Sequence, residues 1–266
     1  MLASLSGPAL AQTPVSPAVP TKVVVRVIAT GGKFLGDDVG GAQISIRDIA
    51  SGELLATGVT HGGSGPADLM TQPITRTQPI PTEDAENSAA YFGTTLLLDR
   101  PHLAEVSAVG PLIAPNPARA SATVWLVPGQ NLSAGNGTPD RALLLEIPGL
   151  LIDVLAPPAH YMAHKADVSK PFEIRANVTM MCGCPIGQSP WPAADFDVVA
   201  HIRHGEAHVD VPLQFETTES NGAPSQFVSR SWIPGDAGVF NIEVVASQRS
   251  SGNLGVGLSS VILFKP

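Results

Sequence analysis

The chain has 266 residues and a formal net charge of −8, with 44% hydrophobic but only 14% charged residues. Phosphate binding needs clustered cations, and no basic patch is visible, so the composition argues against nucleic acid as a partner. No apolar run is long enough to span a bilayer, and the composition is not that of a disordered chain.

The N-terminus carries a prediction about location. Residues 1–11 are uncharged and small or apolar, and Ala9-Leu10-Ala11 resembles the small-x-small cleavage site of a secretory signal. A Pro-rich spacer follows at residues 13–20. We therefore expect residues 1–20 to be a signal-peptide-like segment with its spacer, and the protein to be periplasmic or secreted. An ordinary N-terminal tail is the alternative interpretation.

The distribution of Gly and Pro indicates the fold class. The 26 Gly and 25 Pro residues interrupt the chain every few positions, which argues against long helices. Short runs rich in Val, Ile, Leu and Thr lie between them, a pattern typical of all-β sandwiches. We predict an all-β fold with two tandem β-sandwich domains, the first at residues 21–149 and the second at residues 150–266.

The first half contains a succession of expected strands around a long Pro-rich connection. Over residues 22–65, a Gly-Ala pair, a strand, an acidic turn with Gly and a second strand follow one another, which resembles the carboxypeptidase regulatory-like and transthyretin-like sandwich modules. Residues 62–87 are too rich in Pro for a central strand, so we expect an exposed extended loop there. The expected strands are residues 22–29, 39–48, 54–60, 91–99, 104–109, 120–127 and 142–147.

The second half shows clearer alternation of apolar and polar residues. Strands are expected at 150–155, 172–180 and 196–203, and Gly205-Glu206 fits a two-residue hairpin turn with Gly first. That turn fixes the register of the hairpin and separates a core face from a polar outer face. The predicted cross-strand pairs are His204 with Ala207, Arg203 with His208, Ile202 with Val209, and His201 with Asp210.

A motif near the C-terminus points to a family resemblance. Residues 235–242 resemble the Asp-x-Gly-x-Tyr-x-Cys entry to the sixth strand of immunoglobulin-like sandwiches, with Phe240 in place of the Tyr and Ile242 in place of the Cys. Residues 150–266 are therefore similar to bacterial immunoglobulin-like β-sandwich domains. The resemblance implies the sandwich fold and is silent on function. The two replacements exclude the corner hydroxyl bond and the inter-sheet disulfide of that pattern.

The side chains that bind soft metals are clustered in one stretch of the chain. Both Cys, three of the five Met and five of the seven His lie between residues 160 and 208. Thiolate, thioether and imidazole groups bind soft or borderline metals such as Cu(I) and Zn(II). We therefore predict an exported, non-enzymatic binding protein with copper as its candidate cofactor. The candidate metal ligands are Cys182, Cys184, Met180, Met181, His160, Met162 and His164.

Other interpretations of the same residues stay open. Gly183 permits the bend that brings Cys182 and Cys184 within disulfide range, so the pair can also be a loop-stapling disulfide, a pair of buried thiols or a redox couple. The alternative function is then a structural or adhesive module that contacts an unidentified protein partner. The outer face of the predicted hairpin, with His201 and Asp210, is either a second place for a metal or an ordinary solvated face.

Overall fold

The computed structural model describes residues 17–65, 89–133, 142–159, 164–165, 167–187, 189–216 and 225–264. In these residues the fold is all-β, as predicted, and helix is limited to the short 3-10 turns η1 (Asp37–Val39) and η3 (Ala193–Asp195). No helix in the described ranges is long and apolar enough to cross a membrane.

The first half of the chain forms a sandwich of two four-stranded sheets, in the orders β4-β5-β1-β8 and β3-β2-β6-β7. Strand β1 is central, because it pairs antiparallel with β5 and parallel with β8. Alternate residues of β1, including Val23, Val25 and Val27, are fully buried, and Ile44 and Ile46 of β2 are buried in the same cluster. The strands are β1 (Val19–Ala29), β2 (Gln43–Asp48), β3 (Leu54–Val59), β4 (His61–Ser64), β5 (Ala89–Leu98), β6 (His102–Gly110), β7 (Ala118–Leu126) and β8 (Leu143–Ile147).

The second half forms an immunoglobulin-like β-sandwich, in agreement with the resemblance. Its two sheets have the orders β10-β17-β16-β12-β13 and β14-β15-β11-β9. Phe240 and Ile242 are buried in β16, so an apolar pair fills the positions of the family's Tyr and Cys. The strands are β9 (Leu150–Ala156), β10 (His164–Lys165), β11 (Phe172–Met180), β12 (Phe196–His204), β13 (Ala207–Pro212), β14 (Gln214–Glu216), β15 (Gln226–Trp232), β16 (Gly238–Gln248) and β17 (Leu254–Phe264).

The predicted strands all have counterparts in the structure, with boundaries that shift by a few residues. The hairpin register is confirmed for each of the predicted pairs. Strands β4, β10 and β15 were not predicted, and β4 includes residues 62–64, where the extended loop was expected to begin. Most of the Pro-rich connection, from residue 66 onwards, and residues 1–16 of the signal-like segment lie outside the described residues. The likeness of residues 22–65 to carboxypeptidase regulatory-like modules stays a prediction.

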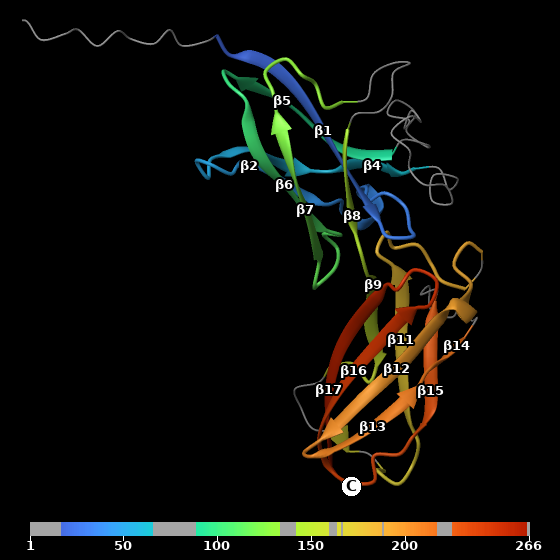
Figure 1. Ribbon diagram of the computed structural model, residues 1–266. Coiled ribbons are helices and arrows are strands. Elements are labelled where there is room, and N and C mark those ends of the chain that lie inside the picture. Colours follow the sequence, from blue (N-terminus) through green and yellow to red (C-terminus); the bar gives the residue numbers. More distant parts are fainter. Residues whose placement is uncertain are drawn as a thin grey trace, which may run out of the picture.

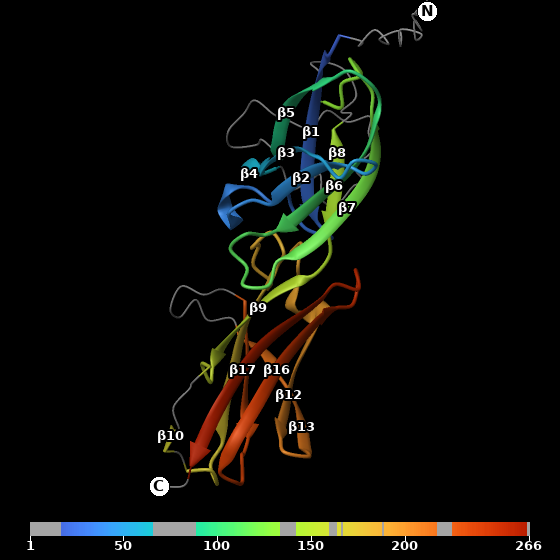
Figure 2. The same cartoon turned by 90° about the vertical axis from the view of Figure 1, so that its left-hand side faces the viewer.

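The two sandwiches follow one another end to end (Figures 1 and 2), and the chain passes from one to the other between β8 and β9. One hydrophobic cluster runs through both, from Val23 in β1 to Leu263 in β17. The predicted boundary at residues 149 and 150 falls at this crossing. That each half folds as an independent domain stays a prediction.

Candidate functional site

The predicted sulfur ligands lie in a tight turn that follows β11. The backbone N–H of Gly183 donates to the Met180 carbonyl oxygen at 2.8 Å, and the N–H of Met180 donates to the Cys184 carbonyl oxygen at 3.0 Å. Gly183 has a φ of +73°, which favours glycine at this position. The turn brings the Cα atoms of Cys182 and Cys184 to 5.3 Å, and the two side chains form a disulfide.

This disulfide changes what the sulfur cluster offers. Thiolates are the metal-binding form of cysteine, and the disulfide leaves neither sulfur as a thiolate. Met180, Met181 and Cys182 are also buried, with 0%, 4% and 5% of their surfaces exposed. In the part of the chain that the structure describes, no group of three or more His, Cys, Asp or Glu side chains could hold a metal ion. Copper binding by the reduced chain stays a prediction.

The predicted His/Met segment does not join the cysteines. His160 and Met162 lie outside the described residues, whereas the backbone of His164 pairs with Leu263 near the end of β17. The other end of β17 lies at the joint with the first sandwich, and nine residues of strand separate the two ends, roughly 30 Å. His164 and the disulfide therefore lie at opposite ends of the second sandwich.

The disulfide turn packs against the first sandwich. A Cβ added to Gly32, in the loop after β1, would lie 3.2 Å from the Cys182 Sγ, and one added to Gly183 would lie 2.8 Å from a methyl group of Val39. A neighbouring loop of the second sandwich adds a hydrogen bond, because the indole N–H of Trp191 donates to the Gly31 carbonyl oxygen at 2.8 Å. The disulfide is thus part of the joint between the two sandwiches.

A buried asparagine gives the joint its polar centre. Asn253 is 2% exposed, and its side-chain amide donates to the Thr30 carbonyl oxygen at 2.8 Å and to Gln248 Oε1 at 3.2 Å. Its Oδ1 accepts the backbone N–H of Gly149 at 3.1 Å. One side chain thereby connects the end of β1, the linker between the sandwiches and the hairpin between β16 and β17.

The joint is not closed on every side. A cleft of about 560 Å³ is lined by Ile113 from the first sandwich and by Ile152, Val256 and Leu258 from the second. Asn177 also lines it, and the Oδ1 of this residue is buried without a hydrogen-bond partner among the described residues. The two sandwiches therefore diverge on this side.

The predicted outer face of the hairpin contains ordinary polar contacts between side chains. The Nδ1 of His201 lies 2.7 Å from Asp210 Oδ1, as the register required, and the two side chains are 37% and 58% exposed. Arg203 contacts Glu243 of the neighbouring strand at 3.6 Å. These contacts run along the sheet surface, so they match the solvated-face interpretation.

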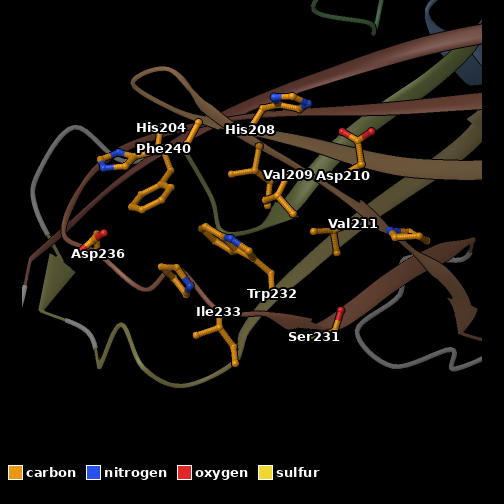
Figure 3. Close-up of a pocket in the computed structure, with 14 residues that line it drawn as sticks. His204, His208, Val209, Asp210, Val211, Ser231, Trp232, Ile233, Asp236 and Phe240 are labelled. Carbon is orange, nitrogen blue, oxygen red and sulfur yellow. The ribbon is translucent and has the colours of Figure 1, made fainter.

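The inner side of the same hairpin borders a pocket of about 450 Å³ (Figure 3). The ring of Trp232 meets that of Phe240 at 5.3 Å and an angle of 72°, and His204 stacks on Phe240 at 4.5 Å. These rings form one wall, and Val209 and Ile233 extend the apolar lining. Among the described residues the lining includes acidic and imidazole side chains but no Lys or Arg. The described lining residues are Ile202, His204, Ala207, His208, Val209, Asp210, Val211, Pro212, Ser231, Trp232, Ile233, Pro234, Asp236 and Phe240.

Two carboxyl groups outside the joint and the pocket have shifted pKa values because they form hydrogen bonds that stabilise the fold. The carboxylate of Asp48 accepts hydrogen bonds from the backbone N–H and the hydroxyl of Ser51 and is hydrogen-bonded to His102. These bonds lower the pKa of Asp48 to about 2 and stabilise the turn between β2 and β3. Hydrogen bonds from Arg230 and Arg175 lower the pKa of Glu216. The same bonds connect β14 to other strands of its sheet. We therefore place no catalysis at these groups.

The sequence reasoning missed the residues that shape both the pocket and the joint. Trp232 lies on the unpredicted strand β15, although the run Gln226-Phe-Val-Ser-Arg-Ser-Trp has the aromatic and β-branched content of a strand. Trp191 and Asn253 lie in loops and were not singled out. Their role depends on contacts with the first sandwich, which no local pattern encodes.

Comparisons with known proteins do not assign the chain to a family. No protein-family model matches it, and no curated protein matches it. A search of solved structures gives fibronectin(III)-like modules of CbhA from Clostridium thermocellum, at 10% identity and a TM-score of 0.23, covering 92% of this chain and 95% of that chain. A likeness at that level supports no conclusion about function. A functional proposal therefore has to rest on the geometry of the structure.

Proposed function

We propose that the chain is an exported, non-enzymatic structural or adhesive module, in which two β-sandwiches are held end to end as a fixed unit. The joint carries this proposal. Interfaces between domains that move freely lack large apolar contacts, whereas here a buried hydrophobic cluster crosses the joint. The hydrogen bonds of Asn253 and Trp191 add directional contacts that a sliding interface would break.

The disulfide supports both the location and the role. Disulfides persist in oxidising compartments, which favours a periplasmic or extracellular place of work. The stapled turn presents Cys182 and Gly183 to Gly32 and Val39 of the first sandwich, so a fixed turn shape maintains the fit between the two units. This arrangement favours the stapling interpretation of the two cysteines over metal transfer or redox exchange.

Small-angle X-ray scattering tests the fixed joint. We expect the wild-type curve to fit a single elongated conformation, and Trp191→Phe, which removes the indole donor to Gly31, to broaden the distribution of overall sizes. Trp125→Phe is the matched control, because Trp125 is exposed on β7 and away from the joint. A wild-type curve that requires a wide ensemble of interdomain angles would contradict the proposal.

Thiol titration of protein prepared without reductant tests the disulfide and the compartment. We expect no reactive thiol until a denaturant and a reductant are both present. Two titratable thiols in protein isolated from its native compartment would remove the argument for an oxidising location.

A further inference from the structure

The five-stranded sheet of the second sandwich ends at an open edge. Strand β13 pairs with β12, and no described strand pairs with its other side. The two-residue turn, with Gly205 at a φ of +57°, makes His204 and Ala207 a hydrogen-bonded pair. Bonding then alternates along β13, so the N–H and C=O groups of His208 and Asp210 point away from β12.

A second open edge lies across the pocket, on β15. Strand β14 covers β15 only from Gln226 to Val228, and no described strand continues that pairing to Trp232. The N–H of Ser231 instead donates to the hydroxyl oxygen of Ser229, on its own strand, at 3.3 Å. A local side-chain acceptor of this kind substitutes for a missing neighbouring strand.

The pocket occupies the place where a further strand would lie. Val209 shares the core-facing side of β13 with Val211, yet Val209 is 44% exposed and Val211 only 5%. Ile233, on the opposite rim, is 51% exposed. Between them the wall is Trp232 and Phe240, as Figure 3 shows. Core-facing side chains are thus uncovered because the sheet stops one strand short.

We propose that this pocket binds an extended peptide segment of a partner protein, which adds to the edge of β13 as a sixth strand. Alternate side chains of that strand would point inward, so one large apolar or aromatic side chain fills the space between Val209 and Trp232. Exposed N–H and C=O groups at His208 and Asp210 complement a peptide backbone, which a compact small molecule does not offer. The proposal rests on the adhesive role proposed above and names its partner.

The charge of the rim selects the flanking residues of the peptide. Asp210 and Asp236 lie at the pocket, Glu206 lies in the adjoining turn, and none of the described lining residues is Lys or Arg. The outward positions of the added strand lie beside Asp210, so Lys or Arg is favoured there. The expected ligand alternates basic or polar residues with apolar ones around a central aromatic residue.

A random heptapeptide display library, selected on the full-length oxidised protein, provides the probe. We expect enrichment of the alternating pattern with a central aromatic residue. For a synthetic peptide from that selection, Asp210→Pro, which removes an outward N–H, should weaken binding about tenfold or more, whereas Asp210→Asn keeps the N–H and most of the affinity. Val209→Ser should also weaken binding, and Val256→Ser, which changes a 55% exposed valine on β17, should not.

Hydrogen exchange followed by NMR gives a readout specific to strand addition. The amides of His208 and Asp210 should exchange about tenfold more slowly when the peptide is bound. The proposal is overturned if no peptide is enriched, if N-methylation of alternate peptide amides leaves affinity unchanged, or if Asp210→Pro converts a dimer to a monomer in sedimentation. The last result would assign the edge to a second copy of the chain. Scattering reports on the joint rather than on β13, so failure here is distinguishable from failure of the fixed module.

Discussion

Replacement of the buried asparagine at the joint is the sharpest test of how the two sandwiches are held together. Asn253→Ala removes the donor to the Thr30 carbonyl oxygen and the acceptor for the Gly149 N–H. Both backbone groups then lose the hydrogen-bond partner that the buried Asn253 provides. The lost contact with Gln248 matters less, because Ser251 also donates to that side chain. The change adds no bulk, so it isolates the polar contacts.

The expected magnitude follows from the two orphaned groups. A buried backbone donor or acceptor without a partner costs about 1–3 kcal/mol, so the two groups left by Asn253→Ala should lower the free energy of unfolding by about 2–6 kcal/mol. Because the lost bonds connect the end of β1, the linker and the second sandwich, coupling between the halves should weaken as well. We expect a single cooperative transition in the wild type to separate toward two transitions in the variant.

Urea unfolding, followed by tryptophan fluorescence and by far-ultraviolet circular dichroism, measures both effects. Asn241→Ala is the matched control, because Asn241 is exposed on β16 and should change stability by no more than about 0.5 kcal/mol. If Asn253→Ala and Asn241→Ala unfold at the same urea concentration, the polar centre of the joint is not a determinant of stability and the reasoning is refuted.

Three further predictions concern pH, packing and copper. The lowered pKa of Asp48 means that its charged form stabilises the fold at pH values above 3.8 and that this stability is lost as pH falls toward 2. In urea titrations, Asp48→Asn should reduce the loss of unfolding free energy over this pH range. An unchanged loss in the variant would contradict the prediction. Gly32→Ala should lower the free energy of unfolding by about 1–3 kcal/mol, because the added methyl would lie 2.9 Å from the Cβ of Ala29 and 3.2 Å from the Sγ of Cys182. A variant as stable as the wild type would show that the joint accommodates the methyl group without strain. The copper prediction requires stoichiometric Cu(I) binding by the reduced protein that Cys182→Ser/Cys184→Ser abolishes; binding unchanged by that double replacement, measured with a competing chelator, defeats it.

The hairpin of β12 and β13 shows what the sequence determines locally. The Gly205-Glu206 turn and the alternation on both sides predict the same register, and the structure has that register. A slip by one residue would turn Ile202 toward solvent and His201 toward the core, so burial enforces what the turn indicates. Such agreement between turn chemistry and side-chain pattern is what makes a local prediction reliable.

The sulfur cluster shows what composition alone does not determine. Cys182, Cys184 and Met180 are close in sequence because a turn follows β11, and the same turn places their sulfurs in a packed joint. His164 is near in sequence as well, but the chain carries it to the far end of β17. Clustering in sequence reflects chemistry only when topology returns the chain to the same place, and the sequence pattern held no information on that.

The joint also explains why polar residues are buried where apolar ones would pack. A purely apolar contact between two sandwich ends is non-directional, so many rotations of one unit against the other would bury similar areas. The hydrogen bonds of Asn253 and Trp191 are satisfied in one arrangement, and every other rotation leaves buried groups unpaired. Apolar burial thus supplies most of the adhesion at the joint, and the two polar side chains select its angle. A module that presents a binding edge at a set distance and orientation requires that selection.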